Sequence, residues 1–94
     1  MEQSDDNAAY NAAHAHSFKN RAEIQDSEIC GCFYCLRTFP PSDITEWVDR
    51  EGETAVCSHC GIDSVIGSKS GYPINKEFLS QMEKLWFNIP DELK

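Results

Sequence analysis

The sequence predicts a small α+β fold built around a metal site, and three observations support this prediction. The chain has only 94 residues, and domains of this size often need disulfides or a metal to be stable. Its central part contains two Cys-x-x-Cys pairs, which are typical of zinc binding. Short β-prone runs lie between and after these pairs, and one amphipathic helix follows them.

Residues 1–16 are predicted to be a disordered acidic tail. Apart from Tyr10 this segment has no large apolar side chain to bury, although its alanines could support a nascent helix. Residues 17–94 then form a single zinc-binding domain. That domain should begin with a short helix over residues 18–26, for which Ser17 is the expected N-cap.

The first metal-binding turn is expected within residues 30–39. Cys32 and Cys35 form the first Cys-x-x-Cys pair, and Gly31 is expected to let the backbone bend tightly beside the metal. Two prolines then stop the element, and a serine is expected to cap one helical turn over residues 43–46.

A β-hairpin is predicted between the two cysteine pairs. Residues 47–48 and 54–56 are β-prone, and the segment between them contains Gly52, which can take the positive φ of a turn. The hairpin would bring the second pair, Cys57 and Cys60, to the metal.

A strand, a loop and a helix complete the predicted fold. Residues 65–66 could form a third short strand, and a loop over residues 67–73 follows. The clearest element is a helix over residues 75–88, because Asn75 is a good N-cap and Pro90 ends the segment. Its apolar residues recur at helical spacing and form one stripe: Phe78, Leu79, Met82, Leu85, Trp86 and Ile89.

Four cysteines are the predicted ligands of one zinc ion: Cys32, Cys35, Cys57 and Cys60. Four thiolates around Zn²⁺ close its tetrahedral shell and leave no position for water, so such a site is structural and not catalytic. The alternatives are four unliganded thiols or a redox disulfide pair. The redox alternative is less favoured, since that chemistry usually uses one Cys-x-x-Cys in a larger βαβ fold.

Cys30 is the fifth cysteine, and three interpretations stay open for it. It could be a small buried residue, a reactive thiol, or an extra ligand that binds a second ion with His14 or His16. His59 lies between two predicted ligands, and its side chain is expected to point away from the ion into solvent.

The preferred fold is a zinc ribbon, in which a short hairpin or three-stranded sheet carries the metal and the C-terminal helix packs on it. A treble clef is the alternative, and it would need a helix from Cys60 through Ile66. Because Gly67 follows directly, that helix would be short, and the ribbon is therefore favoured.

The charge balance argues against nucleic-acid binding. The chain has eight Lys and Arg against sixteen Asp and Glu, a net charge of −8, whereas non-specific nucleic-acid binding needs cations that neutralise phosphates. No secretory h-region follows Met1, and no apolar run is long enough to cross a membrane. A cytoplasmic protein with free thiols is therefore expected.

The leading functional hypothesis is a non-catalytic zinc protein that acts as a protein-interaction module or regulator. Its contact residues could be Glu51 and Glu53 on the acidic hairpin, or Trp86 and Phe87 on the last helix. The alternative is a metal-dependent enzyme similar to the treble-clef nucleases, which needs a second, open metal site. A nucleic-acid-binding zinc ribbon is less favoured.

Two distinctive motifs are Cys-Gly-Cys-Phe-Tyr-Cys over residues 30–35 and Cys-Gly-Ile-Asp-Ser-Val-Ile-Gly over residues 60–67. In these motifs the chain resembles a family of small uncharacterised proteins of bacteria and their phages, labelled only as cytoplasmic proteins. The similarity extends from about His16 to Phe87. Ser58 departs from the pattern, which would have proline there. The resemblance implies a cytosolic bacterial or phage zinc-binding protein and supplies no activity.

Overall fold

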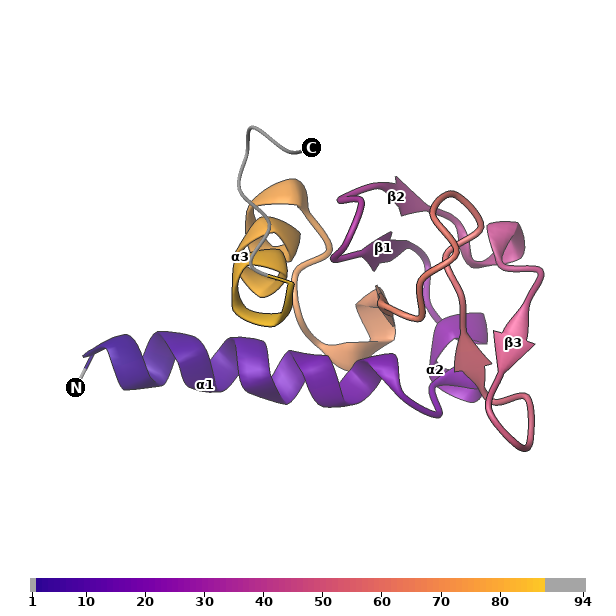
Figure 1. Ribbon diagram of the computed structural model, residues 1–94, viewed down its shortest axis with the longest axis horizontal. Coiled ribbons are helices and arrows are strands. Elements are labelled where there is room, and N and C mark those ends of the chain that lie inside the picture. Colours follow the sequence, from indigo (N-terminus) through magenta and orange to yellow (C-terminus); the bar gives the residue numbers. More distant parts are fainter. Residues whose placement is uncertain (1, 88–94) are drawn as a thin grey trace.

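The structure contains two short antiparallel sheets; the larger lies between α3 (Lys76–Trp86) and the smaller, which is at one end of the molecule (Figure 1). The computed structural model describes residues 2–87, with side chains from residue 8 onward. The strands are β1 (Cys30–Cys32), β2 (Thr38–Phe39), β3 (Trp47–Val48), β4 (Thr54–Ala55) and β5 (Val65–Gly67). One sheet has the order β2-β1-β5, and the other pairs β3 with β4.

Strand β1 is the central strand of the larger sheet. It is antiparallel to β2, with Cys30 opposite Phe39, and antiparallel to β5, with Cys32 opposite Val65. All three residues of β1 are buried. The predicted strand at residues 65–66 therefore exists, but it pairs with the segment of the first cysteines instead of joining the hairpin.

The smaller sheet is the predicted hairpin. Trp47 lies opposite Ala55, and Val48 lies opposite Thr54. Gly52 in the connecting turn has φ 68°, which is the left-handed conformation that glycine adopts without steric cost. The hairpin prediction is confirmed.

The described part of the chain contains three α-helices and three short 3₁₀ turns. Figure 1 shows α1 along one side of the molecule with α3 next to it, and the hairpin at the opposite end from α3. The helices are α1 (Glu2–His14), α2 (Arg21–Gln25) and α3 (Lys76–Trp86), and the turns are η1 (Ala15–Ser17), η2 (Pro41–Asp43) and η3 (Ser68–Ser70). None of these helices is both long and apolar enough to cross a membrane.

Helix α1 corrects the prediction of a disordered tail over residues 1–16. Ala13 of α1 is fully buried. The Tyr10 ring lies 5.0 Å from the Phe78 ring, and the His14 ring lies 4.4 Å from the Trp86 ring, measured between centroids. The sequence of α1 has no apolar stripe of its own, so packing against the rest of the fold, including α3, adds to what its alanines contribute to helix formation.

The predicted helix over residues 18–26 is shorter in the structure, because α2 begins at Arg21. Ser17 does not cap it; its hydroxyl donates to the carbonyl of His14 at 2.7 Å within η1. The helical turn predicted over residues 43–46 is also displaced, since η2 covers Pro41–Asp43. Proline suits the start of such a turn, where its missing N–H is not needed.

Asn20, directly before α2, joins three segments through its buried side chain. Its Nδ2 donates to the carbonyls of His16 and Val65, each at 2.8 Å. Its Oδ1 accepts the N–H of Ala55 at 3.1 Å. Strands from both sheets are therefore bonded to one amide, which holds the two sheets next to each other.

The buried apolar residues form two clusters, one on the cysteine side and one under α1 and α3. Because side chains alternate along β5, Val65 belongs to the first cluster and Ile66 to the second. The first contains Ile24, Cys30, Cys32, Phe39, Ile44, Ala55, Cys57 and Val65. The second contains Ala13, Phe33, Ile66, Leu79 and Met82.

Gly31 has a different role from the predicted bend beside the metal. It lies in β1, and a Cβ atom there would be 2.7 Å from Leu79 Cδ1 and 2.9 Å from Ile74 Cγ2. The absent side chain lets α3 and the segment before it approach the strand closely.

Helix α3 is the element that the sequence predicts best. The side chain of Asn75 accepts the N–H of Phe78 at 2.8 Å, as an N-cap does. Leu79 and Met82 are buried, whereas Leu85 is 39% exposed. The last residues of the predicted helix and stripe, including Ile89 and Pro90, lie outside the described residues.

The structure is a small α+β fold, as predicted. The treble-clef alternative required a helix over residues 60–66, but residues 60–64 have no helical structure and β5 begins at Val65. The helix required by that alternative is therefore missing at that place.

Candidate metal centre

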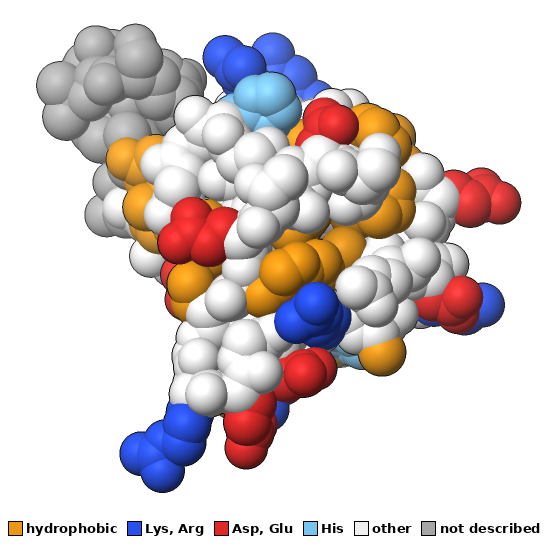
Figure 2. Space-filling model, turned by 90° about the vertical axis from the view of Figure 1, so that its right-hand side faces the viewer, with side chains coloured by type: hydrophobic (Ala, Val, Ile, Leu, Met, Phe, Trp, Pro, Cys, Tyr) orange, Lys and Arg blue, Asp and Glu red, His pale blue; other side chains and the backbone are white. Residues whose placement is uncertain are grey.

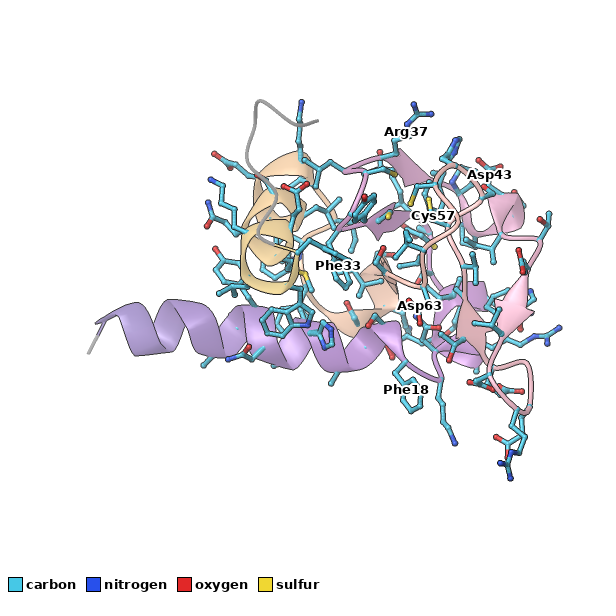
Figure 3. The ribbon with its side chains drawn as sticks, viewed as in Figure 1. Phe18, Phe33, Arg37, Asp43, Cys57 and Asp63 are labelled. Atoms are coloured by element: carbon cyan, nitrogen blue, oxygen red, sulfur yellow. The ribbon has the colours of Figure 1, made fainter. Side chains whose placement is uncertain are left out.

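The four predicted ligand sulfurs lie together. The Sγ atoms of Cys32, Cys35, Cys57 and Cys60 are all within 4.8 Å of one another. Cys32 Sγ is 3.6 Å from Cys60 Sγ, and Cys35 Sγ is 3.7 Å from Cys57 Sγ. Figure 3 shows sulfur atoms gathered close to the labelled Cys57. Sulfurs bound tetrahedrally at about 2.3 Å from one ion are about 3.8 Å apart, so this group could hold a metal ion.

Each pair of sulfurs comes from a different part of the fold. Cys32 ends β1, and Cys35 lies in the turn between β1 and β2. Cys57 follows β4, and Cys60 lies in the turn before β5. A metal held by all four would therefore connect the three-stranded sheet to the hairpin.

The two Cys-x-x-Cys segments fold into the same turn. The N–H of Leu36 donates to the carbonyl of Cys32 at 2.9 Å, and the N–H of Gly61 donates to the carbonyl of Cys57 at 2.8 Å. Leu36 has φ 67° and Gly61 has φ 79°. The sequence predicted this conformation in neither place, and Leu36 adopts it although it has a Cβ atom.

A second backbone bond also repeats in both turns. The N–H of Cys32 donates to the carbonyl of Arg37 at 3.0 Å, and the N–H of Cys57 donates to the carbonyl of Ile62 at 2.9 Å. The first cysteine of each pair is thus fixed by two backbone bonds. Both turns are closed in the same way and present their two sulfurs on one side.

Backbone N–H groups point at the sulfurs. Cys32 Sγ accepts from the N–H of Tyr34 at 3.3 Å and of Cys35 at 3.4 Å. Cys57 Sγ accepts from the N–H of His59 at 3.4 Å. These donors stabilise sulfur as a thiolate, the form that binds metal.

Ser64 adds a side-chain donor that the sequence did not identify. Its Oγ lies 3.0 Å from Cys32 Sγ, and the residue is only 2% exposed. Its carbonyl also accepts the N–H of Phe33 at 2.9 Å. Because a thiolate can only accept, the hydroxyl is the donor when Cys32 is ionised. Spacing alone gave no signal for this residue, since it is only a serine before a short apolar run.

Burial opposes ionisation of two of the sulfurs. Burial raises the pKa of Cys35 to about 11, and it also raises the pKa of Cys60. For Cys57 burial acts in the same direction, but the N–H groups of His59 and Cys60, together with the side chains of Cys35 and Cys60, outweigh it and lower the pKa. Four thiolates this close together need a cation to offset their repulsion, as a divalent metal would do.

Cys30 lies outside the sulfur group. It is completely buried, and burial raises its pKa to about 12, which is the opposite of a reactive thiol. The extra-ligand interpretation also lacks support, because Cys32, Cys35, Cys57 and Cys60 make the one ligand group found within the described residues. The interpretation as a small buried residue agrees with the structure.

The three histidines have other contacts. His14 lies against the ring of Trp86. His16 Nδ1 is 2.8 Å from the carboxylate of Glu23. His59 is exposed, and its Nδ1 accepts from Arg37 Nη1 at 3.2 Å. The side chain of each histidine therefore has a contact other than the sulfurs.

The predicted contact residues on the hairpin differ in their exposure. Glu51 is exposed and lies 3.6 Å from Lys19 Nζ, while Glu53 is half-buried. The turn between them depends on Asp49, whose carboxylate accepts from Thr54 Oγ1 at 2.7 Å and from the N–H of Glu51 at 2.8 Å. The bond from Thr54 is the main reason why the pKa of Asp49 lies below its usual value.

The predicted aromatic edge of α3 is mostly used in packing. Trp86 contacts His14, and the ring of Phe87 lies 4.8 Å from the ring of Tyr34 and 5.8 Å from that of Phe33. Trp86 and Phe87 are both half-buried. Less of this edge is available to a partner than the sequence suggested.

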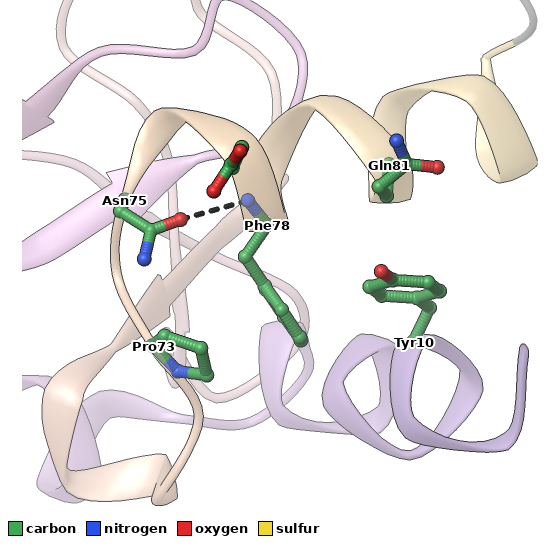
Figure 4. Close-up of a pocket in the computed structure, with 6 residues that line it drawn as sticks. Tyr10, Pro73, Asn75, Phe78 and Gln81 are labelled. Atoms are coloured by element: carbon green, nitrogen blue, oxygen red, sulfur yellow. Dashed lines mark hydrogen bonds between the residues drawn. The ribbon is translucent and has the colours of Figure 1, made fainter. Parts of the chain in front are cut away.

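A hollow of about 300 Å³ lies between α1 and the start of α3 (Figure 4). Among the side chains from residue 8 onward, Glu77 is the one acidic group that lines it, and no serine, cysteine or histidine does. The Oδ1 atom of Asn75 caps α3 there and is already bonded. Its lining lacks the paired nucleophile and base of a hydrolytic site. The lining residues are Tyr10, Pro73, Asn75, Glu77, Phe78 and Gln81.

No protein-family model matches the chain, and no curated protein or solved structure is significantly similar to it. The resemblance to small bacterial and phage proteins stays a prediction.

Proposed function

We propose that this chain is a non-catalytic zinc protein, in which one structural Zn²⁺ supports a surface that binds another protein. The observation that carries the proposal is the arrangement of Cys32, Cys35, Cys57 and Cys60. Their sulfurs are within 4.8 Å of one another, and the two sulfur–sulfur distances of 3.6 and 3.7 Å suit a tetrahedral ion.

Zinc is the ion that this donor set favours. A tetrahedral set of four thiolates is typical of zinc or of iron–sulfur chemistry, and closed Cys₄ sites in small domains are usually structural zinc sites. The repeated turns of the two Cys-x-x-Cys segments, each next to antiparallel strands, support a zinc-ribbon-like arrangement. When bound, the ion would supply charge compensation and a cross-link.

The position of the sulfurs supports a structural role. Cys32 and Cys57 are both buried in the first apolar cluster, and each belongs to a different sheet or its continuation. Removing the ion would leave four thiols near one another and would leave the sheets without one of the links between them, beside the bonds of Asn20. Since a small core contributes little stability by itself, the metal should account for much of the stability of the fold.

A binding role is favoured over an enzyme. The nuclease alternative needs a second, open metal site, and the described residues offer no ligand group besides the four cysteines. The net charge of −8 disfavours the phosphate contacts of a nucleic-acid-binding ribbon. A negatively charged protein with a closed metal shell is suited to contact with a complementary protein surface.

Metal removal tests the proposal. The purified protein should contain one zinc per chain by native mass spectrometry, and a strong chelator should remove it together with the near-ultraviolet circular dichroism of Trp47 and Trp86. Adding zinc back should restore the signal. Cys35→Ser should lose the metal, whereas the matched Cys30→Ser should keep it. A chelated chain with an unchanged spectrum and melting temperature would refute the structural role.

A further inference from the structure

A groove of about 470 Å³ lies between α2 and the segment that connects η2 to β3. Ile44 is 7% exposed and belongs to the buried cluster of Cys32 and Cys57, so it forms the floor. Pro41 and Trp47 are half-buried walls. The described residues that line it are Gln25, Pro41, Ser42, Ile44 and Trp47.

Trp47 is held rigidly at this groove. The guanidinium of Arg21 lies 4.9 Å from the centre of its ring, and Arg21 Nη1 also donates to the carbonyl of Gly52 at 2.9 Å. Pairing opposite Ala55 fixes the backbone of Trp47. A preorganised, half-buried tryptophan loses little conformational entropy on binding and is a frequent energetic centre of protein interfaces.

Two exposed acids are neighbours of the lining residues along the chain, and the guanidinium of Arg21 on Trp47 is the cation next to the groove. The segment over residues 41–48 contains Asp43 and Glu46 and no lysine or arginine. Both acids are exposed, and neither forms an ion pair within residues 8–87. Across the groove, Gln25 is followed by Asp26, which lies 3.7 Å from Lys69 Nζ.

Figure 2 shows this side of the molecule. Hydrophobic side chains cross its middle, acidic side chains lie at several places around them, and one basic side chain lies directly against them. An apolar strip between acids complements a segment that has both apolar and basic side chains. The same charges would repel the phosphates of a nucleic acid or an anionic membrane.

We propose that this groove binds a short basic segment of a partner protein, with an apolar side chain between Pro41 and Trp47 and Lys or Arg beside Asp43 and Glu46. The inference rests on the proposed function, because Ile44 packs in the cluster that contains two of the metal ligands. It moves the contact surface away from the hairpin tip and from the aromatic edge of α3.

The test uses the zinc-loaded chain and the capped peptide acetyl-Lys-Lys-Leu-Lys-Lys-amide, followed by amide and indole chemical shifts. Shift changes should be confined to the residues that line the groove, including the indole N–H of Trp47, and to Asp43 and Glu46. Binding should weaken as salt is added. The acidic peptide acetyl-Glu-Glu-Leu-Glu-Glu-amide should cause no such changes.

Two variants with the same change in net charge show whether peptide binding depends on the acids near the groove or only on the total charge of the chain. Asp43→Asn with Glu46→Gln should weaken binding about tenfold. Glu77→Gln with Gln81→Lys, on α3 at the opposite end of the molecule in Figure 1, should change it little. Ser42→Arg fills the groove from an exposed position and should abolish binding while the melting temperature stays the same.

Other results would overturn the inference. These are equal losses in both charge variants, shift changes elsewhere, or no binding. Concentration-dependent shifts at the groove without peptide would show that a second copy occupies it, which also contradicts the proposal. Zinc is counted by native mass spectrometry in the same sample. If the chain holds one zinc but does not bind the peptide, the groove proposal is wrong and the proposed function still stands. If the chain is folded without zinc, the proposed function is wrong.

Discussion

At the scale of single residues, Ser64 breaks the symmetry between the two metal-binding turns. The backbone bonds around Cys32 and Cys57 correspond one to one, but only Cys32 has a hydroxyl at 3.0 Å from its sulfur. Ser64 reaches it because it directly precedes β5, the neighbour of β1. Its hydroxyl should therefore orient the sulfur and stabilise its negative charge.

Replacing Ser64 with Ala should weaken zinc binding by about tenfold, the lower end of what outer hydrogen-bond partners contribute. Affinity is measured by competition with a chelator of known strength. In the cobalt-substituted protein, the sulfur-to-metal charge-transfer band should shift, because the thiolate of Cys32 loses a donor. Ser64→Thr keeps the hydroxyl and should restore both properties. An unchanged band in the Ala variant would contradict the donor role.

At the scale of elements, close packing between strand and helix decides where α3 lies. Gly31 in β1 leaves room for Leu79 and Ile74, so the C-terminal helix rests directly on the strand that supplies Cys32. The metal site and the helix are therefore connected through one buried strand.

Gly31→Ala should destabilise the fold by about 1–3 kcal/mol, the usual cost of overpacking a core. Urea unfolding of the zinc-loaded protein measures this change. Leu79→Ala should cost about 2–5 kcal/mol alone. In the double variant the new methyl group occupies space that Leu79 vacates, so the combined loss should be smaller than the sum. Additive losses would show that the two residues are not in contact.

The sequence predicted those elements whose signals are local. The N-cap and the apolar stripe were sufficient to predict α3. The β-prone runs on both sides of Gly52 were sufficient to predict the hairpin. The sequence did not show that Cys30–Cys32 forms a strand, because its partners lie at residues 38–39 and 65–67. Helix α1 was not predicted for the same reason. Ala13 packs in the cluster that contains Leu79 and Met82, and Tyr10 contacts Phe78, all far along the chain.

The sequence predicted the four candidate ligands better than any other feature of the structure, because the Cys-x-x-Cys spacing lets the two sulfurs of one turn face the same ion. The surroundings of these ligands were less predictable. The positive φ of Leu36 belongs to a local turn, but no glycine marks it in the sequence. The hydroxyl of Ser64 reaches Cys32 from a distant part of the chain. The groove at Trp47 also combines α2 with η2 and β3, so no single stretch of sequence shows it.

At the scale of the whole molecule, His14 makes stability depend on pH. Burial between α1 and α3 lowers the pKa of His14, and the carboxylate of Asp63 opposes this shift. The folded state therefore prefers the neutral imidazole. Its stability is unaffected by this group above the unfolded pKa of about 6.5 and falls as pH drops below that value.

Thermal unfolding between pH 7.5 and pH 5.5 should show this effect as a falling melting temperature. In His14→Gln the fall should be smaller, because glutamine does not titrate. Protonation of the cysteines acts on both proteins, so the difference between the two pH profiles isolates His14. Parallel profiles would mean that His14 does not contribute.

The central claim is that four cysteines bind one structural zinc. X-ray absorption at the zinc edge on the protein loaded with one equivalent of zinc tests it most directly. The account predicts four sulfur neighbours at about 2.3 Å and no lighter ligand. A shell with nitrogen or oxygen neighbours at about 2.0–2.1 Å, or a chain that retains no zinc, would contradict it.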